Sequence, residues 1–197
     1  GSTSLSHAMR HSLVSRNVAA LADAPKVPEP EIRAITPAAA RQVLAAVKGD
    51  RLEALFTVAL ACGLRQSEAL GLRWSDVDLD SATLKVQRTI QRVNGEYQVF
   101  EPKTKRSRRT ISLPAPVATS LKQHKARQNE DRLRMGPAWE GDAWGGLVFA
   151  DEAGCPLSSY HVGRRFKKLL AVAGLPVMRY HDLRHGAASL MAAQGVP

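Results

Sequence analysis

One block of β-type sequence lies inside a chain that is otherwise patterned for helices. Residues 82–93 (ATLKVQRTIQRV) alternate and are rich in β-branched side chains, which predicts a strand. Asn94-Gly95, the strongest short signal for a hairpin, follows at once, and residues 96–101 (EYQVFE) supply the returning strand. A second turn, PKTKRSRR, leads to a third strand over residues 109–113. We therefore expect a small antiparallel sheet of three strands inserted between helices.

Helical patterns fill most of the remaining chain. Thr36 and Pro37 give one helix its N-cap and its first position, and Gly63 ends the next helix, RLEALFTVALAC. A short helix is predicted at QSEAL. Longer helices are predicted over the charged run 114–135, over YHVGRRFKKLLAVAG, which Gly174 closes, and over HDLRHGAASLMAAQG, which ends at Gly195. The predicted fold class is mainly α with a small three-stranded antiparallel sheet (α+β).

A proline-rich stretch separates the N-terminal segment from the rest of the chain. Apolar residues recur about every four positions in SLSHAMRHSLVSRNVAALAD, which predicts a helix. Pro25, Pro28 and Pro30 then exclude a helix and favour a stiff, extended linker. The expected parts are a terminal helix of an upstream unit over residues 1–22, a linker over 23–35 and one domain over 36–197.

The charge of the chain favours a polyanionic partner. Its 197 residues include 28 Lys and Arg against 18 Asp and Glu, a formal net charge of +10, and nucleic acid is the first candidate for that surplus. Cys62 and Cys155 form no C-x-x-C pair and exclude a disulfide scaffold, and Cys62 lies in an apolar run that predicts a core position. No apolar run is long enough to span a membrane, and no secretory signal is present. These features predict a soluble, cytoplasmic protein.

Two segments place cations where an anion could bind. Arg65 stands between a helix stop and a new helix, so it lies beside free backbone N–H groups. Glu68 could pair with Arg65, and a surface salt bridge is the simpler interpretation of that pair. The second turn predicts a basic finger, which either enters a DNA groove or is a solvated turn, and its cations are Lys103, Lys105, Arg106, Arg108 and Arg109.

The helix YHVGRRFKKLL has one basic and one apolar face. The residues expected to face inward are Val162, Phe166, Leu169 and Leu170. The cations of the outer face are Arg164, Arg165, Lys167 and Lys168. This pattern is typical of a helix that contacts phosphates, but an ordinary amphipathic helix has the same pattern.

The stretch RYHDLRHGAASL carries two histidines four residues apart. His181, Arg184 and His185 share one face of a helix, and Asp182 makes the pattern similar to an H-E-x-x-H zinc helix. Arg184 would repel a metal cation. For a phosphate the same face is favourable, because a guanidinium binds it bidentately and the helix start adds a positive dipole end. We therefore favour a phosphate site and expect no metal and no cofactor.

In this order, GLRQSEALGLRWSDVDLD, KTKRSRRTISLP and HDLRHGAASLMAAQG resemble the motifs of tyrosine recombinases, particularly phage-type integrases. The resemblance covers about residues 36–197, and the ordered set is more specific than any single motif. It implies a helical catalytic domain with a three-stranded sheet. It also implies double-stranded DNA at a recombination or attachment site as partner, with self-assembly on that DNA as a tetramer. SHAMRHSLVSRNVA is similar to the last helix of the core-binding domain of such integrases.

The catalytic positions of the family transfer residue by residue. Arg65 matches the first catalytic arginine and Arg184 the second. Lys103 matches the lysine of the second turn, with Lys105 as the alternative, and His181 matches the catalytic position before the second arginine. In the family a tyrosine attacks a phosphodiester while the arginines hold its nonbridging oxygens. The lysine protonates the 5′-oxygen, and the histidine assists as base or hydrogen-bond donor.

Glu68 and His185 match supporting positions, but the nucleophile is not matched. The family ends with an LGH-type motif and a nucleophilic tyrosine, whereas this chain stops at AAQGVP. Tyr97, Tyr160 and Tyr180 do not match that tyrosine, so we expect a chain truncated at both ends and inactive in cleavage. Two alternatives stay open: a DNA-binding module without catalysis, and a zinc hydrolase that uses HDLRH.

Overall fold

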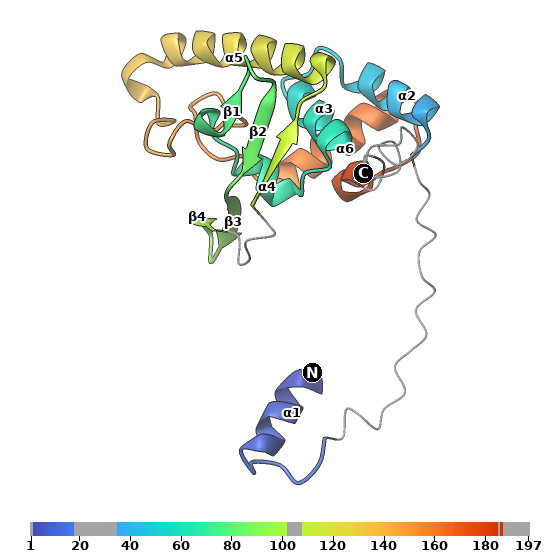
Figure 1. Ribbon diagram of the computed structural model, residues 1–197, viewed down its shortest axis with the longest axis vertical. Coiled ribbons are helices and arrows are strands. Elements are labelled where there is room, and N and C mark those ends of the chain that lie inside the picture. Colours follow the sequence, from blue (N-terminus) through green and yellow to red (C-terminus); the bar gives the residue numbers. More distant parts are fainter. Residues whose placement is uncertain (1, 18–34, 102–107, 185, 187–197) are drawn as a thin grey trace. The chain divides into compact units, whose positions relative to one another are not determined.

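A computed structural model describes residues 2–17, 35–101, 108–184 and 186. The chain divides into two units, residues 1–31 and 32–197, and each is described by itself (Figure 1). The predicted features outside the described residues are the linker up to residue 34, Lys103, Lys105, Arg106, His185 and the end of the last helix at Gly195.

The N-terminal unit contains α1 (Ser2–Arg10), which is shorter than the predicted helix. Within residues 2–17 the helix ends after Arg10, and Ser12 has a positive φ of 55°. The Asn17 side-chain amide donates to Ser6 Oγ at 2.9 Å, so the chain turns back along the helix. One continuous helix is therefore a wrong prediction here. Serine and asparagine side chains offer the backbone local hydrogen bonds that compete with the helix.

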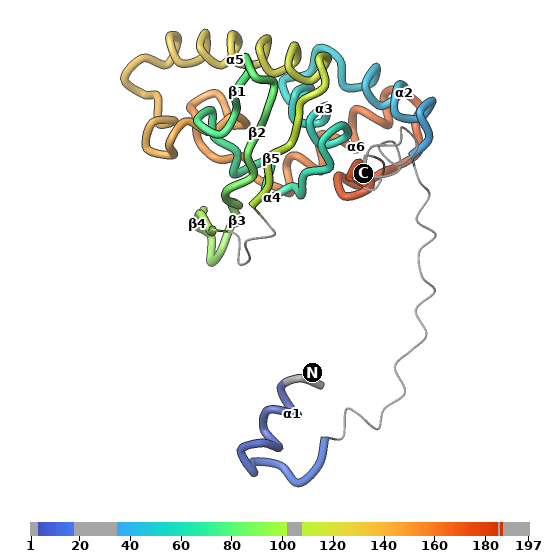
Figure 2. The backbone as a smooth tube through the Cα atoms, in the orientation of Figure 1, coloured from blue at the N-terminus to red at the C-terminus, as the bar shows by residue number. Residues whose placement is uncertain are grey.

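The helices of the second unit lie where the sequence predicts them. Thr36 caps the first of them, with its Oγ1 accepting from Ala39 N at 3.2 Å, and Gly63 ends the next with a φ of 61°. Figure 2 follows the chain through α2 (Pro37–Val47), α3 (Glu53–Cys62), α4 (Gln66–Leu70), α5 (Ala115–Met135) and α6 (Ser159–Val172). Short 3-10 turns occur at η2 (Trp74–Asp76) and η4 (Gly136–Ala138), and residues 180–184 and 186 are again helical.

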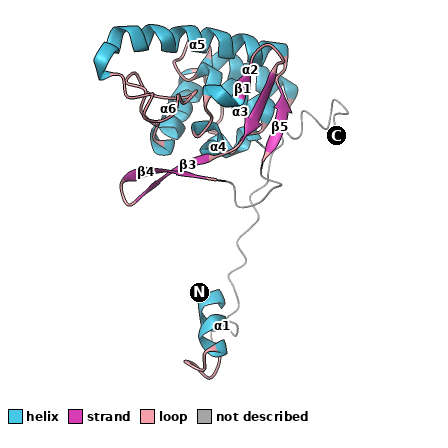
Figure 3. Cartoon of the chain, turned by 60° about the vertical axis from the view of Figure 1, so that its left-hand side comes forward, coloured by secondary structure: helices cyan, strands magenta, loops and turns pink. Residues whose placement is uncertain are grey.

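The β-type block forms two sheets instead of one. Figure 3 shows β1 (Val77–Asp78), β2 (Thr83–Val86) and β5 (Arg109–Ser112) together, and β3 (Thr89–Val93) and β4 (Glu96–Phe100) as a separate hairpin. The first sheet is antiparallel in the order β1-β2-β5. The turn of the hairpin is confirmed at Asn94 and Gly95, with φ values of 52° and 89°.

The predicted strand over residues 82–93 is wrong because the chain leaves the sheet at its middle. Arg88 turns inward and pairs with Asp76, whose side chain is 2% exposed. Gly71 packs against the start of β3, where a Cβ would lie 3.0 Å from Ile90 N. The new strand direction is therefore set by the contact with the end of α4. The three-stranded sheet is completed by β1, not by the predicted strand 96–101.

The core is centred on α3, which is buried nearly all round. Leu55, Phe56 and Val58 have no exposed surface, and the Phe56 ring lies 4.8 Å from the Phe166 ring of α6. Each such side chain contributes about 1.5–3 kcal/mol to folding. α5 and α2 pack against α3, and α2 also packs against α6. Cys62 is buried at 5% exposure, as predicted. Among the described residues, no helix is both long and apolar enough to cross a membrane.

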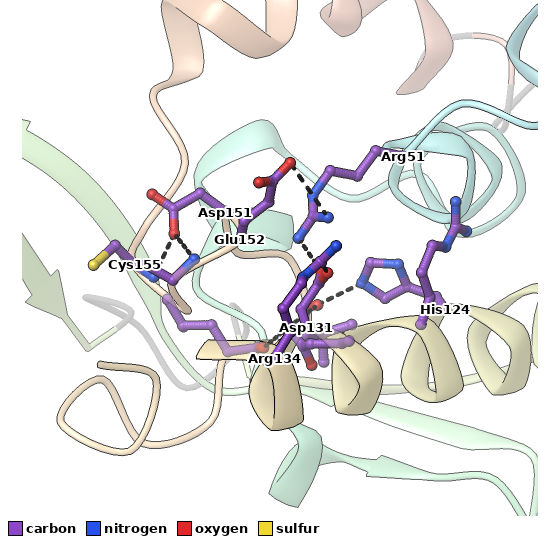
Figure 4. Close-up of polar contacts among 12 residues, drawn as sticks. Arg51, His124, Asp131, Arg134, Asp151, Glu152 and Cys155 are labelled. Atoms are coloured by element: carbon purple, nitrogen blue, oxygen red, sulfur yellow. Dashed lines mark hydrogen bonds and ion pairs between the residues drawn. The ribbon is translucent and has the colours of Figure 1, made fainter. Parts of the chain in front are cut away.

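Buried polar side chains of α5 tie this helix to two other segments (Figure 4). The His124 Nε2 atom lies 2.7 Å from the Val148 carbonyl oxygen. Asp131 pairs with Arg51 at 2.6 Å, and Arg51 also lies 4.0 Å from Glu152. Because Arg51 precedes α3 and Glu152 lies in the loop after α5, this group holds α5 across the domain.

His124 makes the stability of the domain depend on pH. Burial lowers its pKa, and the positive charges of Arg127 and Arg51 lower it further, against the opposite effect of the Val148 carbonyl. The unfolded chain therefore takes up a proton at this residue at a higher pH than the folded chain does. The contribution of His124 to stability is complete above its ordinary pKa of 6.5 and is lost as the pH falls below that value.

We predict that His124→Asn weakens the pH dependence of stability between about pH 7.5 and about pH 5.5. The urea midpoint of the wild type should fall over this range, and that of His124→Asn should fall less. His161→Asn is the matched control, since His161 is exposed on α6, and it should keep the wild-type pH dependence. A His124→Asn variant with the full wild-type dependence would show that His124 is not the responsible group.

Candidate active site

The turn between α3 and α4 places Arg65 at a helix N-terminus. Leu64 is fully buried, and Arg65 takes the N-cap position of α4 with φ −63° and ψ 148°. Glu68 returns to this cap, since its Oε2 accepts from Arg65 N at 2.9 Å and its Oε1 accepts from Arg65 Nη1 at 2.8 Å. The Glu68 side chain is only 3% exposed. The interpretation as a surface salt bridge is therefore wrong, and the pair contains a buried carboxylate.

A second guanidinium reaches the same carboxylate from β5. Arg109 Nη2 lies 2.9 Å from Glu68 Oε2, and Arg109 Nη1 lies 3.3 Å from Oε1. Arg109 is half-buried and pairs with Val86 across the sheet, so it does not lie on a projecting finger. Burial alone would raise the pKa of Glu68, but the hydrogen bonds from Arg109 and Arg65 outweigh burial and lower it. Glu68 is therefore ionised at neutral pH.

A third guanidinium, that of Arg184, joins this group from the last helix. Burial lowers the pKa of Arg184, and the nearby charge of Arg65 lowers it further, as does that of Arg109, while Glu68 raises it. The Nη1 atom of Arg184 is buried and has no hydrogen-bond partner among the residues that the structure describes. The charges of Arg65, Glu68 and Arg109 all act on Arg184, so these four side chains lie near one another. The carboxylate itself is bound by the guanidinium groups of Arg65 and Arg109.

Consecutive residues of the last helix have different surroundings. Tyr180 is 5% exposed, and its hydroxyl has no hydrogen-bond partner in the described part of the chain. Burial raises the pKa of this hydroxyl, and the negative charge of Glu68 raises it further. His181 beside it is exposed. Asp182 accepts from Arg179 N at 2.6 Å, so this acid caps the helix, which is not the role of the general base in a zinc helix.

α6 begins beside the start of α4 and carries the predicted basic face. Gln66 Nε2 donates to the Ser159 carbonyl at 2.9 Å, which joins the start of α4 to the start of α6. The inward positions are confirmed, with burial of Val162, Phe166 and Leu170 and packing of Leu169 against the core. The exposed cations are Arg164, Arg165, Lys167 and Lys168. Arg165 differs from the others because its Nε donates to buried Asp50 Oδ2 at 2.8 Å.

Only part of the predicted basic finger is described. Arg108 Nη2 lies 2.6 Å from Glu101 Oε2, and both side chains are exposed. The residues whose roles stay predictions, since they lie outside the described residues, are Lys103, Lys105, Arg106 and His185. Within the described ranges, no group of three His, Cys, Asp or Glu residues could hold a metal ion.

The bond between Arg109 and Glu68 is the part of the site that the sequence did not predict, since 41 residues separate the two. A repeated octad, GLRQSEAL and GLRWSDVD at residues 63–78, is a signal for the buried acid. In the second octad Asp76 Oδ2 accepts from Arg73 N at 3.0 Å and also pairs with Arg88. In both octads a buried acid caps a short helix and binds an arginine from a later segment.

The chain is similar to known proteins over most of its length. The model of the phage integrase family matches residues 25–197. A tyrosine recombinase XerC-like protein of Caldanaerobacter subterraneus subsp. tengcongensis is 38% identical over 178 residues, covering 86% of this chain and 46% of that protein. An integrase of Streptomyces ambofaciens is 34% identical over 203 residues, covering 96% of this chain and 50% of that protein. This chain therefore spans about half the length of these relatives.

Solved structures share the fold. The Tn1549 transposon integrase in complex with a circular intermediate DNA matches with a TM-score of 0.76 and 21% identity, over 100% of this chain and 65% of that chain. XerA recombinase matches with a TM-score of 0.65 and 20% identity, over 88% of this chain and 54% of that chain. The predicted fold class, mainly α with a small three-stranded sheet, is confirmed. The family model, the identity to its relatives and the ordered motifs show that this chain belongs to the phage integrase family of tyrosine recombinases.

Proposed function

We propose that this chain is the phosphate-binding part of a site-specific DNA recombinase, which cuts and rejoins duplex DNA. The pair Arg65 and Arg184 beside ionised Glu68 carries this proposal. The Arg65 side chain is 55% exposed, and Arg184 Nη1 has no partner in the described part of the site. Donors in excess over acceptors suit an anion, and the family resemblance indicates a DNA phosphate.

The reaction concentrates negative charge on the phosphorus centre. Arg65 and Arg184 compensate that charge from fixed positions, which is usually the largest contribution to such catalysis. A tyrosine oxygen attacks phosphorus and the bond to the 5′-oxygen breaks, leaving a 3′-phosphotyrosyl link and a 5′-hydroxyl. By resemblance, Lys103 gives the proton to the leaving oxygen and His181 assists as base or hydrogen-bond donor. The covalent link conserves the bond energy, so rejoining requires no nucleotide cofactor.

The basic face of α6 extends the proposed DNA contact beyond the reacting phosphate. Arg164 and Lys168 lie one turn apart on the exposed side of the helix, and Lys167 is exposed as well. Their charges suit neighbouring phosphates of the duplex. Arg165 contributes less, because Asp50 already holds it. By resemblance, the N-terminal unit belongs to a core-binding domain, and the whole protein assembles on DNA as a tetramer.

The tyrosines of this chain do not match the position of the attacking tyrosine in the family. The Tyr97 ring packs edge-on against Trp144 at 6.3 Å, and Tyr160 lies on the outside of α6 under Arg164. Tyr180 is next to His181, but its hydroxyl is buried. We infer that the 197-residue chain does not form the covalent intermediate by itself.

We predict that Arg65→Gln and Arg184→Gln each lower the salt dependence of duplex-DNA binding. The slope of log affinity against log salt should fall by about 0.9 in each variant, since each loses one phosphate contact. Fluorescence anisotropy at a series of salt concentrations measures this slope. Arg132→Gln is the matched control, because Arg132 is an exposed cation held by Asp142 at 2.9 Å, and its slope should not change. Wild-type slopes in both site variants would contradict the phosphate-binding role.

We predict that Tyr180→Phe leaves adduct formation unchanged and does not destabilise the fold. The test incubates each chain with attachment-site DNA that is nicked near the cleavage position, so that any cut strand is trapped. Denaturing gels should show no protein–DNA adduct with either chain. The urea midpoint should stay the same or rise, since an unpartnered buried hydroxyl costs about 1–3 kcal/mol. An adduct that disappears in Tyr180→Phe would identify Tyr180 as the nucleophile and overturn this placement.

A further inference from the structure

Glu68 is shared between two arginines that differ in their surroundings. Its Oε1 accepts from Arg65 Nη1 at 2.8 Å and from Arg109 Nη1 at 3.3 Å. Its Oε2 accepts from Arg109 Nη2 and from the Arg65 backbone, each at 2.9 Å. Arg109 thus spans both carboxylate oxygens with its side chain, whereas Arg65 uses a single side-chain nitrogen. The Arg65 side chain is 55% exposed and that of Arg109 is 31% exposed.

The fork of Arg109 limits how strongly Glu68 can bind Arg65. A carboxylate prefers a bidentate guanidinium, and a buried carboxylate attracts its cation more strongly than one in water. If Arg109 were absent, Glu68 would have Arg65 as its main cation and would draw that guanidinium into a two-nitrogen pair. Arg65 would then have less charge and fewer donors left for another anion.

We propose that Arg109 is a positioning residue, which neutralises Glu68 so that the Arg65 guanidinium stays available to a phosphate. This inference rests on the proposed function of Arg65 and Arg184. Arg109 does not have to touch the phosphate in this role, because it acts through Glu68. As the first residue of β5, Arg109 also links the start of this strand to Glu68.

A cycle of variants separates this positioning role from a purely structural role of Arg109. Arg109→Gln leaves Glu68 with one arginine, and we predict that phosphate affinity falls about tenfold, a loss of about 1.4 kcal/mol. Adding Glu68→Gln to Arg109→Gln removes the excess negative charge, and affinity should return to within about twofold of the wild type. A purely structural role predicts that the affinity stays low in the double variant. Removing Glu68 as well as Arg109 cannot restore a structure that the loss of Arg109 alone has disturbed.

Inorganic phosphate is the probe, and side-chain Nε–H signals of Arg65 and Arg184 in NMR spectra are the readout. Arg109→Lys keeps a cation beside Glu68 and should bind phosphate within about threefold of the wild type. Arg132→Gln is the matched control, since Arg132 is an exposed cation that pairs with exposed Asp142 at 2.9 Å, and the affinity of this variant should not change. Backbone amide spectra show whether each variant is folded. If Arg109→Gln alone does not fold, the phosphate affinity of the double variant still tests the proposal, which predicts a value close to that of the wild type.

Each outcome decides between the interpretations. Weak binding by Arg109→Gln that is restored in the double variant supports the proposal. Wild-type affinity in Arg109→Gln, or a double variant at least tenfold weaker than the wild type, overturns it while Arg65 and Arg184 keep their phosphate role. If phosphate moves neither arginine signal in the wild type, the proposed function fails, and the role of Arg109 fails with it.

Discussion

The buried carboxylate of Glu68 is the constraint on which the rest of the site depends. A carboxylate that is 3% exposed stays ionised only when charges and hydrogen bonds replace its water. Glu68 obtains both through four hydrogen bonds, from the Arg65 backbone and from the side chains of Arg65 and Arg109. The same bonds fix the start of α4 and the first residue of β5. One ion cluster therefore joins the turn before α4, the first residue of β5 and the candidate active site.

Among the described residues, this cluster contains more positive charge than negative charge. Arg184 is placed near two other guanidinium groups, and its Nη1 has no partner among the described residues. Such an arrangement destabilises a folded domain, and native structures keep it mainly where function requires it. A bound phosphate would supply both the missing acceptor and the missing negative charge. The domain is therefore less stable without an anion in this site than with an anion bound there.

Features with a local cause were predictable, and features with a tertiary cause were not. The stop at Gly63 and the hairpin turn are set by residues with special backbone preferences, which the sequence shows directly. The break in the predicted strand comes from the pairing of Arg88 with Asp76, which no local pattern contains. The same holds for Arg109, whose charge suggested DNA contact although its partner is Glu68 on another element. The family motifs indicate Arg65 and Arg184 as candidate catalytic residues, but they do not indicate Arg109, which binds the carboxylate of Glu68.

The pKa of Glu68 is the most direct measure of this arrangement. It can be followed by the carbon-13 shift of the side-chain carboxyl as the pH is lowered, with Glu68→Gln identifying the signal. We predict a pKa below the ordinary value for glutamate in the wild type, because the two arginines outweigh burial. The pKa should rise when Arg109 is replaced by glutamine. A wild-type pKa at or above the ordinary value would mean that burial dominates, and would contradict an ionised carboxylate as the centre of the site.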